Sequence, residues 1–210
     1  MGRDKILQRI RSALGESHAS EHDRALLDAR MDQRPSGPKV ALGAERMSQF
    51  LTKVIANNFT VERLASQQLL VSAVRALMPD DETPDISVAK AIQSLGWPAD
   101  WKINYGPGRH VERLCVTQAL AGIAETGSVV VASAPDNPTT LNFLPDMHVI
   151  VLRAEDVVDH PEDVWARMAL ENWPRAVNVI SGPSRTADVG GIIVRPAHGP
   201  KRVHLIVIDA

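Results

Sequence analysis

The chain has 210 residues, of which 44% are hydrophobic, and its 23 Lys and Arg residues against 25 Asp and Glu residues give a formal net charge of −2. These values predict a globular protein with a real apolar core, and they argue against wholesale disorder, a coiled rod or a general nucleic-acid binder, which usually carries a basic excess. The one cysteine, Cys115, excludes a disulfide framework, an iron–sulfur cluster and a cysteine-based zinc site within this chain alone.

The apolar runs of the sequence are strand-sized, so we expect no membrane span. Residues 1–14 mix charged residues with scattered apolar ones, and they lack the continuous apolar stretch of a signal peptide. We therefore expect a cytoplasmic protein.

The first predicted element is a short amphipathic helix within residues 1–14. Apolar residues recur at helical spacing from Ile6 to Leu14, and Gly15 follows where a helix often ends. Residues 16–39 carry many charges and no sustained apolar face. We therefore interpret residues 1–40 as an N-terminal helical arm and linker, which packs on a partner or on the rest of the chain.

The body of the protein is predicted as one domain over residues 41–210. It begins with a helical stripe at 47–57, a run at 59–64 that suggests a strand, and a helical segment at 66–77. Five strand-length runs rich in β-branched residues follow at 114–116, 129–132, 148–152, 177–180 and 203–208, and a helix is predicted at 161–172. This alternation indicates an α/β domain with a largely parallel sheet flanked by helices.

Ligands of open α/β sheets bind beyond the carboxyl ends of the strands, so the loops beside these runs are where we look for a site. Residues 123–128 (IAETGS) place a carboxylate, two hydroxyls and a glycine just before a strand. Residues 181–188 (SGPSRTAD) leave a strand through Gly-Pro and then supply two hydroxyls, a guanidinium and a carboxylate. Residues 198–202 (HGPKR) enter the final strand.

The second and third of these loops concentrate positive charge. Residues 181–202 contain four basic residues and the single acidic residue Asp188, in a chain that is net negative. Such a pocket suits a small anion. Arg185 can hold a carboxylate or phosphate with two parallel hydrogen bonds, and the hydroxyls of Ser184 and Thr186 can complete the contact.

A proton carrier is predicted beside this anion site. His198 is the natural one near neutral pH, with Asp188 or Glu125 able to orient it. The loops also have structural explanations, because Glu125 and Thr126 can cap an element and Gly-Pro pairs make turns. The dinucleotide fingerprint, the P-loop and the serine-hydrolase elbow are absent from the sequence. Cys115 stands in an apolar run and is expected to be a buried structural thiol.

Four stretches of the chain form a recognisable set: IAETGS at 123–128, NFLPDMHVIV at 142–151, SGPSRTAD at 181–188 and HGPKRVHLIVI at 198–208. This set resembles the LUD-domain proteins, in the branch called LutC (lactate utilization protein C) or YkgG, and RDKILQRIRSAL at 3–14 is similar to that family's N-terminal helix. The resemblance implies that residues 41–210 form a LUD domain with a fold similar to the NagB/RpiA/CoA-transferase group.

The matching motifs extend the set of expected site residues. The expected substrate-binding residues are Arg185, Ser184, Thr186, Thr126, Gly127 and Gly199. The expected catalytic residues are His198, Asp188 and Glu125. In the sharpest version of this hypothesis, Arg185 grips the substrate carboxylate while His198 removes the hydroxyl proton.

The resemblance implies a role in oxidising L-lactate to pyruvate together with separate iron–sulfur partner proteins. The iron–sulfur clusters are then expected in the partners, with no cofactor and no metal in this chain, and the ligand is a small carboxylate. A homodimer is a fair default for such a domain. The sequence departs from the family pattern at 190–191 and at 195–197, which leaves the identity of the 2-hydroxy acid open.

Two other functions stay open. The chain can be a non-catalytic assembly or regulatory subunit of the same system, with the arm at 1–38 docking the iron–sulfur partners. It can also be an independent enzyme of the NagB/RpiA/CoA-transferase-like group that acts on a small phosphorylated or CoA-linked substrate. In that case Glu125 is the natural nucleophile or base.

Overall fold

The computed structural model describes residues 2–14, 20–33, 37–40, 42, 45–79, 83–109, 112–168, 173–185 and 198–209. The chain divides into two units, Met1–Lys39 and Val40–Ala210. Within the described ranges, no helix combines the length and the apolar character that crossing a bilayer requires.

The first unit consists of two helices, α1 (Arg3–Leu14) and α2 (Glu21–Gln33), and neither buries a residue. The helix predicted near the start of the chain is confirmed as α1. No helix was predicted at α2, because its residues form no apolar stripe. Local hydrogen bonds mark its start instead: the Ser20 hydroxyl accepts a bond from the Asp23 N–H (3.0 Å), and the Asp23 carboxylate accepts bonds from the Ser20 hydroxyl (2.7 Å) and N–H (3.0 Å).

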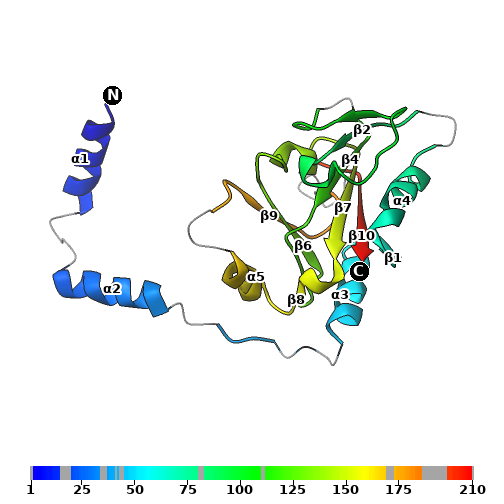
Figure 1. Ribbon diagram of the computed structural model, residues 1–210. Coiled ribbons are helices and arrows are strands. Elements are labelled where there is room, and N and C mark those ends of the chain that lie inside the picture. Colours follow the sequence, from blue (N-terminus) through cyan, green and yellow to red (C-terminus); the bar gives the residue numbers. More distant parts are fainter. Residues whose placement is uncertain are drawn as a thin grey trace, which may run out of the picture. The chain divides into compact units, whose positions relative to one another are not determined.

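The larger sheet of the second unit contains only parallel neighbours, in the order β1, β10, β7, β4, β2, β3. The strands are β1 (Thr60–Leu64), β10 (Arg202–Ile208), β7 (Met147–Arg153), β4 (Leu114–Gln118), β2 (Asp85–Val88) and β3 (Lys102–Asn104). Figure 1 shows β7 and β10 side by side near the middle of this sheet. The predicted runs at 114–116, 148–152 and 203–208 lie here, so the predicted α/β class with a largely parallel sheet is confirmed.

The predicted strands at 129–132 and 177–180 are confirmed but lie in a second sheet. Its order is β8 (Val157–Val158), β5 (Ala121–Ile123), β6 (Ser128–Ala132), β9 (Val177–Ile180). β6 runs antiparallel to both β5 and β9, while β5 and β8 are parallel. β5 and β6 form a hairpin because only residues 124–127 separate them, and Gly127 takes a φ of 66° in the turn. The apolar runs alone could not separate the two sheets, because β-branched runs look alike in both.

Three longer helices accompany the sheets: α3 (Arg46–Ala56), α4 (Leu70–Ala76) and α5 (Pro161–Arg167). The short 3₁₀ turns are η1 (Gln67–Leu69), η2 (Lys90–Ile92), η3 (Thr139–Asn142) and η4 (Ala154–Asp156). The predicted helices at 47–57 and 66–77 are confirmed as α3 and as η1 with α4. The helix predicted at 161–172 ends earlier, at Arg167, because Met168 takes an extended ψ of 120°. Residues 169–172 lie outside the described residues.

Three apolar clusters define the layers of the second unit. One lies between the larger sheet and α4, and a second lies between the two sheets together with α3. The third lies between the second sheet and α5 (Figure 1). β7 sends Val149 and Val151 into the first cluster and Ile150 and Leu152 into the second. Its sequence is therefore continuously apolar, as in a strand buried on both faces.

Cys115 of β4 is a buried free thiol in the first cluster, as predicted. Burial is the main cause that raises the pKa of this thiol to about 12. The side chain therefore stays protonated near neutral pH and serves packing.

Candidate functional site

A cavity of about 440 Å³ lies at the ends of β7 and β10 where these strands begin. Its lining comes from the start of both strands, the end of β9, the end of η3 and the two loops predicted to carry positive charge. The lining residues are Asn142, Phe143, His148, Ile180, Gly182, Ser184, Arg185, His198, Gly199, Pro200 and Val203. The sequence argument looked beyond the carboxyl ends of the parallel strands, whereas this cavity lies at the amino ends of β7 and β10. The second sheet explains the difference, because β9 delivers its following loop to the opposite edge.

The two predicted loops meet at one side of this cavity. The Ser184 N–H donates to the Pro200 carbonyl at 3.0 Å, and the His198 N–H donates to the Ser184 hydroxyl at 3.0 Å. Gly199 packs so close to Ser184 that a Cβ at Gly199 would lie 3.4 Å from the Ser184 Cβ. The structure thus brings Ser184 to His198 and Gly199, although Ser184 and His198 lie 14 positions apart in the chain.

The guanidinium of Arg185 lies against the end of α3. Its Nη2 donates a long hydrogen bond of 3.5 Å to the carbonyl of Asn57, the residue that follows α3. Gly182 approaches the same carbonyl, since a Cβ on Gly182 would lie 2.2 Å from the Asn57 oxygen, and its φ is 119°. Among the described residues, Arg185 forms no ion pair with a carboxylate. Its exposed guanidinium is therefore available to an anion in the cavity.

The lining of the cavity also includes two buried polar side chains that the sequence argument missed. His148 of β7 is fully buried, and its Nε2 lies 2.7 Å from the hydroxyl of Thr117 on β4. Its Nδ1 has no hydrogen-bond partner among the described residues, and neither has Oδ1 of Asn142, which is 3% exposed. Burial lowers the pKa of His148 to about 3, so this ring is neutral at pH 7. A histidine inside an apolar strand run was the signal available in the motif at 142–151.

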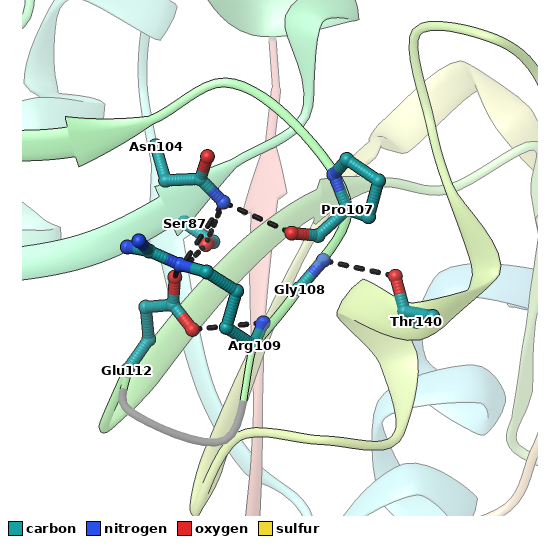
Figure 2. A network of polar contacts seen from close by, with 7 residues as sticks. All are labelled: Ser87, Asn104, Pro107, Gly108, Arg109, Glu112 and Thr140. Atoms are coloured by element: carbon teal, nitrogen blue, oxygen red, sulfur yellow. Dashed lines mark hydrogen bonds and ion pairs between the residues drawn. The ribbon is translucent and has the colours of Figure 1, made fainter.

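The turn that carries Asn142 is supported by a network of polar contacts (Figure 2). The Gly108 N–H donates to the Thr140 hydroxyl at 2.9 Å, which joins the loop after β3 to η3. The Glu112 carboxylate, whose side chain has no exposed surface, anchors this loop. It accepts hydrogen bonds from the Ser87 hydroxyl (2.8 Å) and from the N–H and Nε of Arg109 (2.8 and 2.5 Å). Burial raises the pKa of Glu112, but the hydrogen bonds from Arg109 and Ser87 outweigh this and lower it.

Glu125 lies elsewhere, and the structure does not bring it to His198. Its Oε2 is 2.8 Å from Nδ1 of His160, the residue that caps α5, and it does not line the cavity. The geometry pairs Glu125 with a different histidine from the one that the sequence argument chose.

Thr126 and Gly127 also lie outside the cavity lining, and they support its wall. The Asn57 side-chain amide donates to the carbonyls of Thr126 (2.9 Å) and Gly127 (3.1 Å). The Thr126 hydroxyl donates to the Ser128 hydroxyl at 2.8 Å, and that hydroxyl lies 2.7 Å from the hydroxyl of Ser181. The turn therefore holds the end of α3 and the start of the loop that carries Arg185.

Thr186 and Asp188, which were also predicted, lie outside the described residues. Within the ranges that are described, no group of three or more His, Cys, Asp or Glu side chains could hold a metal ion. A larger hollow of about 930 Å³ lies between α5 and the second sheet, but its described lining includes none of the predicted site residues. The smaller cavity is therefore the candidate site.

Comparison with known proteins gives similarities over different shares of the chain. The YkgG protein of Escherichia coli is 36% identical over 100 residues, which are 45% of this chain and 43% of that protein. A lactate utilization protein C of Bacillus pumilus is 33% identical over 94 residues, 41% of this chain and 38% of that protein. The match to a lactate utilization protein C of Deinococcus radiodurans is longer, with 26% identity over 202 residues, 89% of this chain and 91% of that protein. The chain thus spans less than half the length of the first two relatives.

The fold has a counterpart among solved structures. A crystal structure of a DUF162 family protein from Deinococcus radiodurans has a TM-score of 0.61 and 20% identity, and the match covers 80% of this chain and 99% of that one. The LUD domain family model matches residues 113–208, which run from the start of β4 to the end of β10 and include most of the cavity lining. Over these residues the chain is similar to the LUD domain family, as its motifs predict.

Proposed function

We propose that this chain is a subunit of a lactate utilization system and binds a small 2-hydroxy acid in the cavity beside β10. The observation that carries the proposal is the meeting of Arg185, Ser184 and His198 around one cavity. The similarity to proteins named lactate utilization protein C supports lactate as the ligand.

Arg185 supplies the carboxylate contact in this proposal. Its guanidinium is exposed to the cavity and can hold both carboxylate oxygens with parallel hydrogen bonds. The Ser184 hydroxyl accepts a hydrogen bond from the His198 backbone, so it holds the loop of Arg185 against the loop of His198.

His198 is the proton acceptor in the proposed oxidation. Conversion of L-lactate to pyruvate removes two protons and two electrons, and the imidazole takes the proton of the hydroxyl. The iron–sulfur clusters of the partner proteins would accept the two electrons, and the second proton, from C2, would be released to solvent. The residues of this chain do not fit a cluster of their own, because its single cysteine is buried in β4 with a strongly raised pKa.

A second function, assembly of the partner proteins, is favoured by the first unit. α1 and α2 leave large apolar side chains exposed, among them Ile10 (49%), Leu14 (74%) and Met31 (71%). Deletion of residues 2–39 should leave lactate binding by the second unit intact and abolish co-purification of the iron–sulfur partners. An independent activity on phosphorylated or CoA-linked substrates predicts turnover by the purified chain without partners.

The test of the main proposal is a pair of arginine variants. L-Lactate binding to the purified chain is measured by calorimetry, and lactate-dependent dye reduction is measured with the native partners. Arg185→Ala should lower both the affinity and kcat/KM about a hundredfold, the cost of losing a charge-assisted bidentate contact. Arg153→Ala, which removes an exposed arginine paired with Glu155 away from the cavity, is the matched control. If both variants bind and react as the unaltered chain does, the proposed site is wrong.

A further inference from the structure

The lining of the cavity contains exposed and buried polar residues. Arg185 and His198 are exposed, whereas His148 and Asn142 are buried at 0% and 3% exposure. Each buried side chain has one polar atom without a hydrogen-bond partner among the described residues. Buried polar atoms are nearly always paired in native proteins, and these two orphan atoms belong to residues that line one cavity, where a group from outside the chain can pair with them.

We propose that His148 and Asn142 form the ligand-recognition end of this cavity and bind the uncharged hydroxyl of the 2-hydroxy acid. This inference rests on the proposed function and adds the part of the ligand that Arg185 does not contact. The carboxylate lies at the exposed guanidinium of Arg185, and the hydroxyl lies at the buried neutral pair.

Thr117 positions the His148 ring for this contact. The Thr117 hydroxyl holds Nε2 at 2.7 Å, and when it donates to Nε2 the ring carries its proton on Nδ1. Nδ1–H then donates to the hydroxyl oxygen of the ligand. The orphan Oδ1 of Asn142, at the end of η3, accepts a hydrogen bond from the ligand hydroxyl until His198 removes that proton. The network around Glu112 holds this turn in place (Figure 2).

The chain contains a matched control for His148. His204 of β10 is also buried and also has a threonine hydroxyl at 2.7 Å from one ring nitrogen. Its second nitrogen likewise has no hydrogen-bond partner among the described residues, although Oε2 of Glu62 lies 3.8 Å away. It does not line the cavity. Substitution of either histidine by phenylalanine keeps a buried ring but removes the contact between a ring nitrogen and a threonine hydroxyl. Only the change at His148 alters the proposed ligand-binding residues.

The experiment compares L-lactate with propionate, which has the carboxylate and lacks the hydroxyl. Binding of both acids to the full chain is measured by calorimetry, and the ring nitrogen resonances are followed by ¹⁵N NMR of histidine-labelled protein. The unaltered chain should bind lactate at least about tenfold more tightly than propionate, since a site with buried polar groups rejects an analogue that cannot pair them. Lactate should shift the Nδ1 resonance of His148, and propionate should not.

The variants then assign the preference. His148→Phe should bind lactate and propionate equally. Thr117→Val is a smaller change, which keeps the test possible if His148→Phe does not fold. It should weaken the preference for lactate and leave propionate binding intact. His204→Phe should keep the preference. Equal binding of both acids by the unaltered chain, lost in Arg185→Ala, would overturn the hydroxyl site while the proposed function stands. If neither acid binds and inorganic phosphate does, the proposed function and the hydroxyl site both fail.

Discussion

Gly182 offers a sharp test of how the cavity is built. A methyl group at this position would lie 2.2 Å from the carbonyl oxygen of Asn57, whereas ordinary C···O contacts are about 3.3 Å or longer. The loop or the end of α3 must therefore move by about 1 Å in Gly182→Ala. A displacement of that size at a binding or catalytic group costs about a hundredfold in rate. The positive φ of 119° adds about 1–3 kcal/mol of backbone strain.

The control for this prediction is Gly96→Ala. Gly96 also has a positive φ, 72°, but a Cβ there meets no atom within 4 Å. Urea unfolding should show that both variants lose stability, and calorimetry with L-lactate should show that only Gly182→Ala loses affinity. Unchanged affinity in Gly182→Ala, or an equal loss in both variants, would refute the argument that contact with Asn57 sets the position of Arg185.

Three further predictions concern stability and reactivity. Glu112→Gln should cost about 2 kcal/mol in urea unfolding at pH 7, because hydrogen bonds to a buried charged group are lost. The lowered pKa of Glu112 makes its contribution complete above the ordinary value of 4.5 and lost as the pH falls below it, so the variant and the unaltered chain should converge in acid. Asn57→Ala removes two hydrogen bonds to the turn at Thr126 and Gly127 and should cost about 1–2 kcal/mol in the same assay. Cys115 should react with a thiol reagent only after urea unfolding, and rapid labelling of the folded chain at pH 7 would contradict its burial.

The sequence allowed most of the fold to be predicted, because the strands are encoded by local apolar runs. β4, β7 and β10 are recognisable from β-branched residues alone, since both faces of each strand are buried. The sequence did not show that β6 and β9 belong to a second sheet, because that sheet depends on the turn at 124–127 and on the strand pairing across it. α2 was missed because its start rests on Ser20 and Asp23 and not on an apolar stripe.

The site was predictable where charge and loop chemistry revealed it. Arg185, Ser184 and His198 were selected as polar groups in loops and Gly199 as part of a matching motif, and all four line one cavity. Glu125 was assigned to His198 because it is acidic and precedes a strand, but hairpin geometry places it beside His160. His148 and Asn142 could not be selected from charge, because a neutral histidine and an amide carry none. Their polar atoms without hydrogen-bond partners are identified only in the structure.

The place of β10 in the larger sheet has a consequence for synthesis. β1 is an edge strand whose neighbour in that sheet is β10, and Thr60 faces His204 across a separation of 144 residues. A nascent chain on the ribosome therefore cannot pair β1 until almost the whole second unit has been made, and such distant pairing slows folding. A chain stalled before Arg202 should leave β1 open to proteolysis, and it should bind no ligand, because the cavity wall arrives with the last strand.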